Sequence, residues 1–279
     1  MNTTTFNDLK VNFHFTERCN FRCKFCFAPF ASKVLPFDTL LQAVSKIAES
    51  KSCTAINFAG GEPTIYDRLA ELLKFAHQSG LNCSLITNGY NLADNLLTDI
   101  LPHITQIGFS VHSFNEETKK AIMSCTTDFK TLTNNRLNDL CNQIVASGYD
   151  CKIKVNTVVC SLNKDEVMVS SIMQLPLTQW KILRCQKNAR NASMTISDDE
   201  FEMFCNRNLG FKGTTIENDM QNTYIIINPQ GDLVFNSGMK YTKCGNVLTD
   251  NIDELLVKYP LRIDEYNKRE KYFCGKYNH

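Results

Sequence analysis

Short apolar runs alternate with longer amphipathic stretches along most of the chain. The apolar runs predict six strands, at Lys10–Phe15, Ala55–Phe58, Cys83–Ile86, Ile107–Ser110, Lys152–Val159 and Trp180–Cys185. Helical spacing predicts helices at about 38–50, 66–79, 92–100, 131–147, 164–174 and 198–208. This alternation indicates an α/β fold with a parallel sheet and right-handed crossovers. Six such units favour an open, partial (β/α)6 barrel of the TIM type, with its chemistry at the carboxyl ends of the strands.

The pattern changes after residue 210. Tyr224–Ile227 and Leu233–Phe235 flank a segment that contains Pro229 and Gly231, which predicts a β-hairpin. A helix is predicted near 251–258, and a tail rich in Lys, Arg and Tyr follows it. No Ser/Gly linker interrupts the chain, so we expect residues 1–209 to form the barrel and 210–279 an extension packed on it.

The composition is that of an ordinary globular protein. The 279 residues are 43% hydrophobic and carry 30 Lys+Arg against 29 Asp+Glu, which argues against disorder and against a generalised DNA-binding surface. The amino terminus lacks a signal-like apolar core, and no window has the roughly 18 apolar residues of a membrane helix. We therefore expect a cytoplasmic protein without membrane contact, whose 13 cysteines stay thiols or bind metal.

Three cysteines follow the first predicted strand at C-x3-C-x2-C spacing. Thiolates of Cys19, Cys23 and Cys26 can hold one [4Fe-4S] cluster and leave its fourth iron free for a cofactor or substrate. Two alternatives are a zinc site completed by His14 and a set of unrelated buried cysteines. The spacing, the place after a strand and the flanking aromatic residues favour the cluster.

Further segments end the next strands: Ala59-Gly60-Gly61-Glu62-Pro63 the second, Thr87-Asn88-Gly89 the third and Ser110 the fourth. With the cysteine loop, they resemble the radical S-adenosylmethionine enzymes. The resemblance implies a partial barrel and a [4Fe-4S] cluster whose free iron chelates S-adenosylmethionine. A carboxylate at Glu62 suits the methionine ammonium, and glycines before it allow close backbone approach and positive φ. The resemblance also implies that the cofactor contacts Phe25, Gly60, Gly61, Glu62, Thr87, Asn88, Ser110 and Asn156.

A closer resemblance, from about Val11 to Tyr272, is to viperin and its prokaryotic relatives. It is carried by Asn12-Phe13-His14-Phe15-Thr16 before the cysteine loop, by the segments 154–159 and 180–185, by 198–204 and by 271–273. It implies that a 5′-deoxyadenosyl radical takes the ribose 4′ hydrogen of a nucleoside triphosphate. Loss of the 3′ hydroxyl as water then gives a 3′-deoxy-3′,4′-didehydro nucleotide, a chain terminator in antiviral defence.

The same resemblance implies a nucleotide site. Its residues are Asn12, His14, Lys154, Lys181, Arg184, Arg269, Lys271 and Tyr272. Lys154 and Lys181 face one cavity from the fifth and sixth strands. Strand alternation directs Arg184 to the opposite face unless the strand ends or bulges there. Arg184 therefore ranks below the two lysines as a nucleotide ligand. Tyr272 folds over the nucleotide and is a candidate catalytic residue. The proton donor stays open among Tyr272, His14 and water.

Three positions depart from the viperin pattern. Ala55 and Gln179 replace two cations, and His112 stands where vertebrate viperins carry Asp. The membrane helix of the animal protein is not found either, which favours a soluble form. We expect a monomer reduced by an external flavodoxin- or ferredoxin-type donor, since no second cluster motif is evident.

Two other functions compete with this interpretation. One is a peptide-modifying radical enzyme whose auxiliary cluster uses Cys205, Cys244 and Cys274, although these lack C-x2-C pairing. The other is an iron-sulfur or zinc protein for redox sensing without catalysis, which leaves the Gly60-Gly61-Glu62 segment unexplained. Counting iron separates the first alternative from a single-cluster enzyme.

Overall fold

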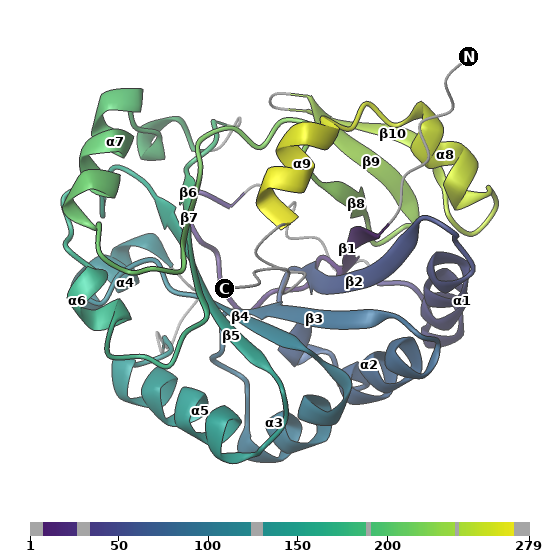
Figure 1. Ribbon diagram of the computed structural model, residues 1–279, viewed down its shortest axis with the longest axis horizontal. Coiled ribbons are helices and arrows are strands. Elements are labelled where there is room, and N and C mark those ends of the chain that lie inside the picture. Colours follow the sequence, from purple (N-terminus) through teal and green to yellow (C-terminus); the bar gives the residue numbers. More distant parts are fainter. Residues whose placement is uncertain (1–7, 27–33, 124–130, 188–190, 238–239, 271–279) are drawn as a thin grey trace.

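The structure, a computed structural model, describes residues 8–26, 34–123, 131–187, 191–237 and 240–270. One ten-stranded sheet curves around the centre of the molecule, in the order β10-β9-β8-β1-β2-β3-β4-β5-β6-β7, with helices on its outer face (Figure 1). The strands from β8 through β7 run parallel, and β9 and β10 are antiparallel additions. The sheet is open between β7 and β10, which confirms the predicted unclosed α/β barrel.

The strands are β1 (Leu9–Thr16), β2 (Cys53–Gly60), β3 (Asn82–Thr87), β4 (Gln106–Ser110), β5 (Lys152–Val159), β6 (Gln179–Arg184), β7 (Thr214–Glu217), β8 (Ile225–Ile227), β9 (Asp232–Ser237) and β10 (Lys240–Asn246). The helices are α1 (Phe37–Ala48), α2 (Leu69–Gln78), α3 (Asp94–Ile100), α4 (Glu116–Ile122), α5 (Asn134–Ala146), α6 (Val169–Ile172), α7 (Asp198–Arg207), α8 (Ile252–Lys258) and α9 (Ile263–Glu270).

All six predicted barrel strands and the hairpin are present. The pattern missed β7, β10, α4 and α9, and the helix predicted at 164–174 is wrong in extent, because only Val169–Ile172 is α-helical. Asn163 holds the preceding chain as a turn: its side chain accepts from the Cys160 amide at 2.7 Å and donates to the Val158 carbonyl at 2.9 Å. The Asn208 side chain then accepts from the Val169 amide at 3.1 Å, where the helix begins.

Side-chain alternation along β1 divides the core from the interior of the barrel. Val11, Phe13 and Phe15 are fully buried in the hydrophobic core. The residues between them, Lys10, Asn12 and His14, line a cavity instead. A strand period of two thus places a polar row inside the barrel and an apolar row against the helices.

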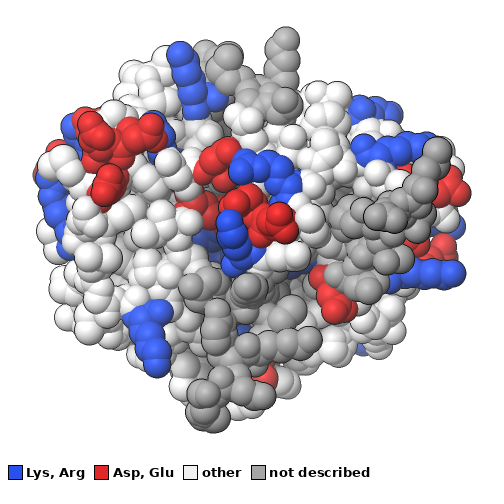
Figure 2. Space-filling view, turned by 45° about the horizontal axis from the view of Figure 1, so that its top comes forward, with Lys and Arg blue, Asp and Glu red and all other residues white. Residues whose placement is uncertain are grey.

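Buried tyrosines hold the chain from α8 to α9 against the sheet. The Tyr259 hydroxyl donates to the carbonyls of Tyr224 (2.6 Å) and Val234 (2.7 Å), and the Tyr266 hydroxyl accepts from the Lys10 amide at 2.6 Å. On the face shown in Figure 2, positive and negative side chains are interspersed. Within the described ranges, no helix is long and apolar enough to cross a membrane.

Candidate active site

A cavity of about 340 Å³ occupies the interior of the barrel. It runs from the loop after β1, which carries three cysteines, to lysines near the amino-terminal ends of β1, β5 and β6. The residues predicted for the cofactor lie together in it: Cys19, Cys23, Phe25, Cys26, Gly60, Gly61, Glu62, Thr87, Asn88, Ser110 and Asn156.

The cysteine loop is held by backbone hydrogen bonds. The Cys26 amide donates to the Cys23 carbonyl at 3.0 Å, and the Lys24 amide donates to the Ile122 carbonyl at the end of α4, also at 3.0 Å. Burial raises the pKa of the Cys19 thiol to about 11, against a small lowering by the Phe21 amide, which donates to its sulfur. Burial also raises the pKa of Cys23, and the neighbouring Cys26 and Cys19 add to the rise. The three thiols therefore lie close enough to influence one another and favour a bound cation that stabilises thiolates.

The loop fits an iron-sulfur cluster better than a single metal ion. No three His, Cys, Asp or Glu side chains converge on one ion site in the described parts of the chain. In a cubane each thiolate binds a different iron, so the sulfurs need not converge. Asn20 adds a second observation: its side-chain oxygen accepts from the Asn88 amide group at 2.8 Å, while its buried Nδ2 has no hydrogen-bond partner among the described residues. A buried donor of this kind suits an acceptor held beside the cysteines.

The glycines after β2 bring the cysteine loop and Glu62 together. A Cβ at Gly61 would lie 2.0 Å from the Arg18 carbonyl oxygen, and one at Gly60 would lie 2.3 Å from that of Thr16. Gly60 also has φ +136°, as the sequence predicts, although the close approach is to the chain's own backbone. The Gly61 amide donates to the Thr16 carbonyl at 2.7 Å, and the Glu62 amide donates to the Arg18 carbonyl at 2.8 Å. These bonds hold the end of β2 beside the start of the cysteine loop.

Glu62 is a buried carboxylate surrounded by donors. It accepts from the Thr64 amide (3.0 Å) and hydroxyl (2.6 Å), from the Thr87 hydroxyl (2.6 Å) and from the Asn88 amide (2.7 Å). Desolvation raises its pKa, and these hydrogen bonds oppose the rise. A carboxylate oriented in this way is suited to an ammonium group in the cavity.

His112 lies at the end of β4 against Phe25, with the two rings edge to face and 4.7 Å between centroids. Its Nδ1 accepts from the Val158 amide at 3.2 Å, so the ring hydrogen of the neutral form is on Nε2. Burial lowers the pKa of His112 to about 3 and that of His14 to about 4. Both histidines are therefore neutral near pH 7.

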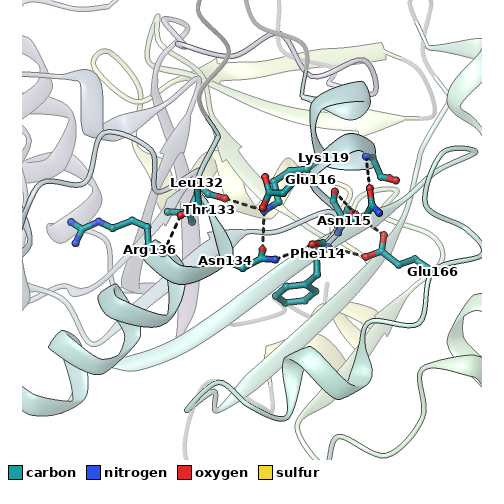
Figure 3. Close-up of polar contacts among 11 residues, drawn as sticks. Phe114, Asn115, Glu116, Lys119, Leu132, Thr133, Asn134, Arg136 and Glu166 are labelled. Carbon is teal, nitrogen blue, oxygen red and sulfur yellow. Dashed lines mark hydrogen bonds and ion pairs between the residues drawn. The ribbon is translucent and has the colours of Figure 1, made fainter.

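A polar network braces the segment that follows His112 (Figure 3). Glu166 accepts from the Ser113 hydroxyl at 2.6 Å and from the Phe114 amide at 2.8 Å. The Asn134 side chain in α5 donates to the Phe114 carbonyl at 2.9 Å and accepts from buried Lys119 at 2.8 Å. α4, α5 and the loop before α6 thus meet beneath the end of β4, which orients the part of the wall that carries His112.

Farther into the barrel the lining is polar and cationic. The Asn57 side chain donates to Asn12 at 3.0 Å and accepts from Ser84 at 2.9 Å, which links the first three strands. Lys10, Lys154 and Lys181 are 8%, 9% and 6% exposed and line the same cavity.

Buried Lys181 belongs to a triad with Tyr224 and Glu217, which are half-buried. Its Nζ lies 2.7 Å from the Tyr224 hydroxyl and forms an ion pair with Glu217. The Tyr224 hydroxyl in turn donates to the Glu217 carboxylate at 2.5 Å. The three side chains come from β6, β7 and the residue before β8, so the triad links the β6–β7 edge of the sheet to the segment that leads into β8.

Comparison with known proteins identifies the family. Residues 13–138 match the model of the radical SAM superfamily. The chain is 31% identical to an S-adenosylmethionine-dependent nucleotide dehydratase of Flammeovirga pacifica, over 95% of this chain and 96% of the relative. It is 29% identical to one of Selenomonas ruminantium, over 94% and 98%. The chain belongs to the radical S-adenosylmethionine nucleotide dehydratases.

Solved structures share the fold at lower identity. SuiB of Streptococcus suis has a TM-score of 0.71 at 13% identity, covering 94% of this chain and 68% of its own. The structure of anSMEcpe with bound AdoMet and the Cp18Cys peptide has a TM-score of 0.67 at 14%, covering 94% and 82%. As a radical S-adenosylmethionine nucleotide dehydratase, this chain is an enzyme that uses S-adenosylmethionine and an iron-sulfur cluster. The non-catalytic alternative is therefore wrong.

Some predicted nucleotide contacts are not brought to the cavity. The Arg184 guanidinium faces the other side of β6, where it donates to the Ile196 carbonyl at 2.7 Å and forms an ion pair with Asp198. Strand alternation accounts for this placement. The side chain of Arg269 and all of Lys271 and Tyr272 lie outside the described residues.

The cysteines considered for an auxiliary cluster do not form a described site either. Cys205, on the buried face of α7, packs in the core, and the Cys244 sulfur lies 3.7 Å from the Leu255 carbonyl between β10 and α8. Figure 1 places α7 and β10 on opposite sides of the molecule. Cys274 lies outside the described residues.

Sequence reasoning missed Lys10, Asn57, Glu217, Tyr224 and Tyr241, of which all but Glu217 line the cavity. The alternation along β1 was a sufficient signal for Lys10, because it shares a face with Asn12 and His14. Glu217 lies on β7, whose four residues are too few to show an alternation of polar and apolar positions. The triad was therefore not predictable from the sequence.

Proposed function

We propose that this enzyme dehydrates a ribonucleoside triphosphate to its 3′-deoxy-3′,4′-didehydro form. The single observation that carries the proposal is that one cavity joins the cysteine loop and Glu62 to Lys154 and Lys181. A substrate held in it reaches the cofactor with its ribose while its anionic chain meets the lysines. The product lacks the 3′ hydroxyl that a polymerase extends, which suits a chain terminator in antiviral defence.

In this proposal Cys19, Cys23 and Cys26 hold one [4Fe-4S] cluster, and Glu62 receives the ammonium of S-adenosylmethionine. Phe25, Ser110 and Asn156 line the wall expected beside the adenosyl group. When bound and reduced by an external flavodoxin- or ferredoxin-type donor, these cofactors supply a 5′-deoxyadenosyl radical. The protein contributes position, since inward-facing side chains of the strands line the cavity in which cofactor and substrate meet.

The lysines provide the phosphate contacts. Lys154 on β5 pairs with Gly108 on β4, and its side chain lines the cavity. Lys10, Lys154 and Lys181 line the same end of the cavity, and Lys181 is paired with Glu217. Several ammonium groups at one end of a cavity suit a polyanionic ligand, and a triphosphate supplies it.

Tyr224 is a further candidate for the proton donor. Removal of the 4′ hydrogen followed by loss of the 3′ hydroxyl as water consumes one further electron and one proton. Tyr224 lines the cavity, and its hydroxyl accepts from the Lys181 ammonium at 2.7 Å. Glu217, which accepts from the same hydroxyl, holds the ring in place. Tyr224 thus joins Tyr272, His14 and water as a candidate.

The test measures 5′-deoxyadenosine in reconstituted, anaerobic enzyme with each ribonucleoside triphosphate. Lys154→Met should raise the nucleotide KM by about 10-fold or more, the worth of one charge-assisted hydrogen bond, while exposed Lys212→Met leaves it unchanged. Cys23→Ala should abolish the reaction. Tyr224→Phe should lower the nucleotide product formed per 5′-deoxyadenosine without raising KM. If no nucleotide stimulates 5′-deoxyadenosine formation in the unaltered enzyme, the substrate assignment is wrong.

A further inference from the structure

Lys10 is a cation of the cavity to which no role has been assigned. It is the second residue of β1, 8% exposed, and lines the cavity together with Lys154 and Lys181. Its backbone is fixed, because its amide donates to the Tyr266 hydroxyl of α9 at 2.6 Å. The start of β1 is therefore held by the carboxy-terminal extension.

The register of the sheet determines what surrounds Lys10. It pairs with Ala55 on β2, and residues paired across parallel strands point to the same face. The small side chain at Ala55 leaves space on that side for the lysine stem. On the other side, Val11 pairs with Ile225 of β8, so the preceding residues Lys10 and Tyr224 are neighbours. Lys10 thus lies between a small residue and the triad of Lys181, Tyr224 and Glu217.

Among the three cavity lysines, Lys10 is the farthest along its strand from the carboxyl end, where the cysteine loop begins. Six residues separate it from Thr16 at the end of β1, about 20 Å along a strand. Lys154 is five residues from the end of β5 and Lys181 three from the end of β6. In a nucleoside triphosphate, the terminal phosphate is the group farthest from the ribose along the phosphate chain.

We propose that Lys10 binds the terminal phosphate of the substrate and makes the enzyme select triphosphates over diphosphates. This inference rests on the proposed function. Lys154 and Lys181, nearer the cysteine loop, contact the inner part of the phosphate chain, and a diphosphate ends before it reaches Lys10. A buried ammonium is suited to a dianionic terminal phosphate, because both are removed from water.

The test compares KM for the tri- and diphosphate of the preferred nucleoside. Lys10→Met keeps the apolar stem and removes the charge. It should raise the triphosphate KM by about 10- to 100-fold, the range for a hydrogen bond between charged groups, and change the diphosphate KM by less than about threefold. Lys212→Met, on the surface, serves as the matched control.

A second variant separates charge from structure. Lys10→Met combined with Ala55→Lys moves the cation to the adjacent, in-register position. It should restore most of the preference for the triphosphate. Iron content should match the unaltered enzyme in both variants, which shows that the fold and the cysteine loop are intact.

Two results would overturn the inference while the proposed function stands. In the first, Lys10→Met changes the triphosphate and diphosphate KM values equally, or changes neither. In the second, the added Ala55→Lys substitution does not restore the preference for the triphosphate. If the unaltered enzyme shows no response to any nucleotide, the proposed function itself has failed.

Discussion

His112 makes stability depend on pH in a way that can be calculated. Burial holds its pKa at about 3, against 6.5 for a free imidazole, so the folded chain keeps it neutral while the unfolded chain protonates it below pH 6.5. A group whose folded pKa is lowered in this way contributes stability that is lost as the pH falls from about 6.5 toward the folded pKa. The stability of the protein should therefore decrease on mild acidification.

The size of the loss follows from linkage. Between pH 7.5 and 5.5, one histidine with these two pKa values lowers the free energy of unfolding by about 1.4 kcal/mol. His14, with a folded pKa of about 4, contributes a similar amount, so the pair should cost about 2.7 kcal/mol. The raised pKa of Glu62 acts in the opposite direction, which is why a comparison of variants is needed.

Urea unfolding of metal-free, reduced protein, followed by circular dichroism at both pH values, measures this difference. His112→Gln should lose about 1.4 kcal/mol less than the unaltered chain between pH 7.5 and 5.5. Exposed Lys120→Met is the control and should behave like the unaltered chain. Equal losses in His112→Gln and the unaltered chain would refute the assignment of a neutral, buried His112.

Two further predictions concern the supports of the site. Gly61→Ala places a Cβ 2.0 Å from the Arg18 carbonyl, so it should destabilise the chain by about 3 kcal/mol and lower the iron bound on reconstitution; full iron loading would contradict the packing. Lys119→Met leaves the Leu132 carbonyl and the Asn134 side chain without their lysine donor, and should cost about 2 kcal/mol in urea unfolding. Exposed Lys120→Met should cost less than about 0.5 kcal/mol, and equal losses in the two lysine variants would show that the buried network is not stabilising.

Sequence was sufficient where local pattern and chemistry coincide. The period of two in β1, the cysteine spacing and the glycines before Glu62 each place residues without knowledge of distant contacts. The pattern also directed Arg184 away from the cavity, as the structure shows. By contrast, the Lys181–Tyr224–Glu217 triad depends on residues up to 43 positions apart. Contacts between such distant residues produce no periodic pattern in the sequence. The hydrogen bonds from Ser113 and Phe114, just after His112, to Glu166 likewise join distant parts of the chain.

The most direct test of the central claim uses a nucleoside triphosphate deuterated at C4′. The reconstituted, reduced enzyme is incubated anaerobically with S-adenosylmethionine and each labelled ribonucleotide, and both products are followed by mass spectrometry. We expect deuterium in 5′-deoxyadenosine, in step with an unlabelled nucleotide product that has lost the 4′ deuterium and the 3′ hydroxyl. Unlabelled 5′-deoxyadenosine, formed without loss of water from any nucleotide, would contradict it.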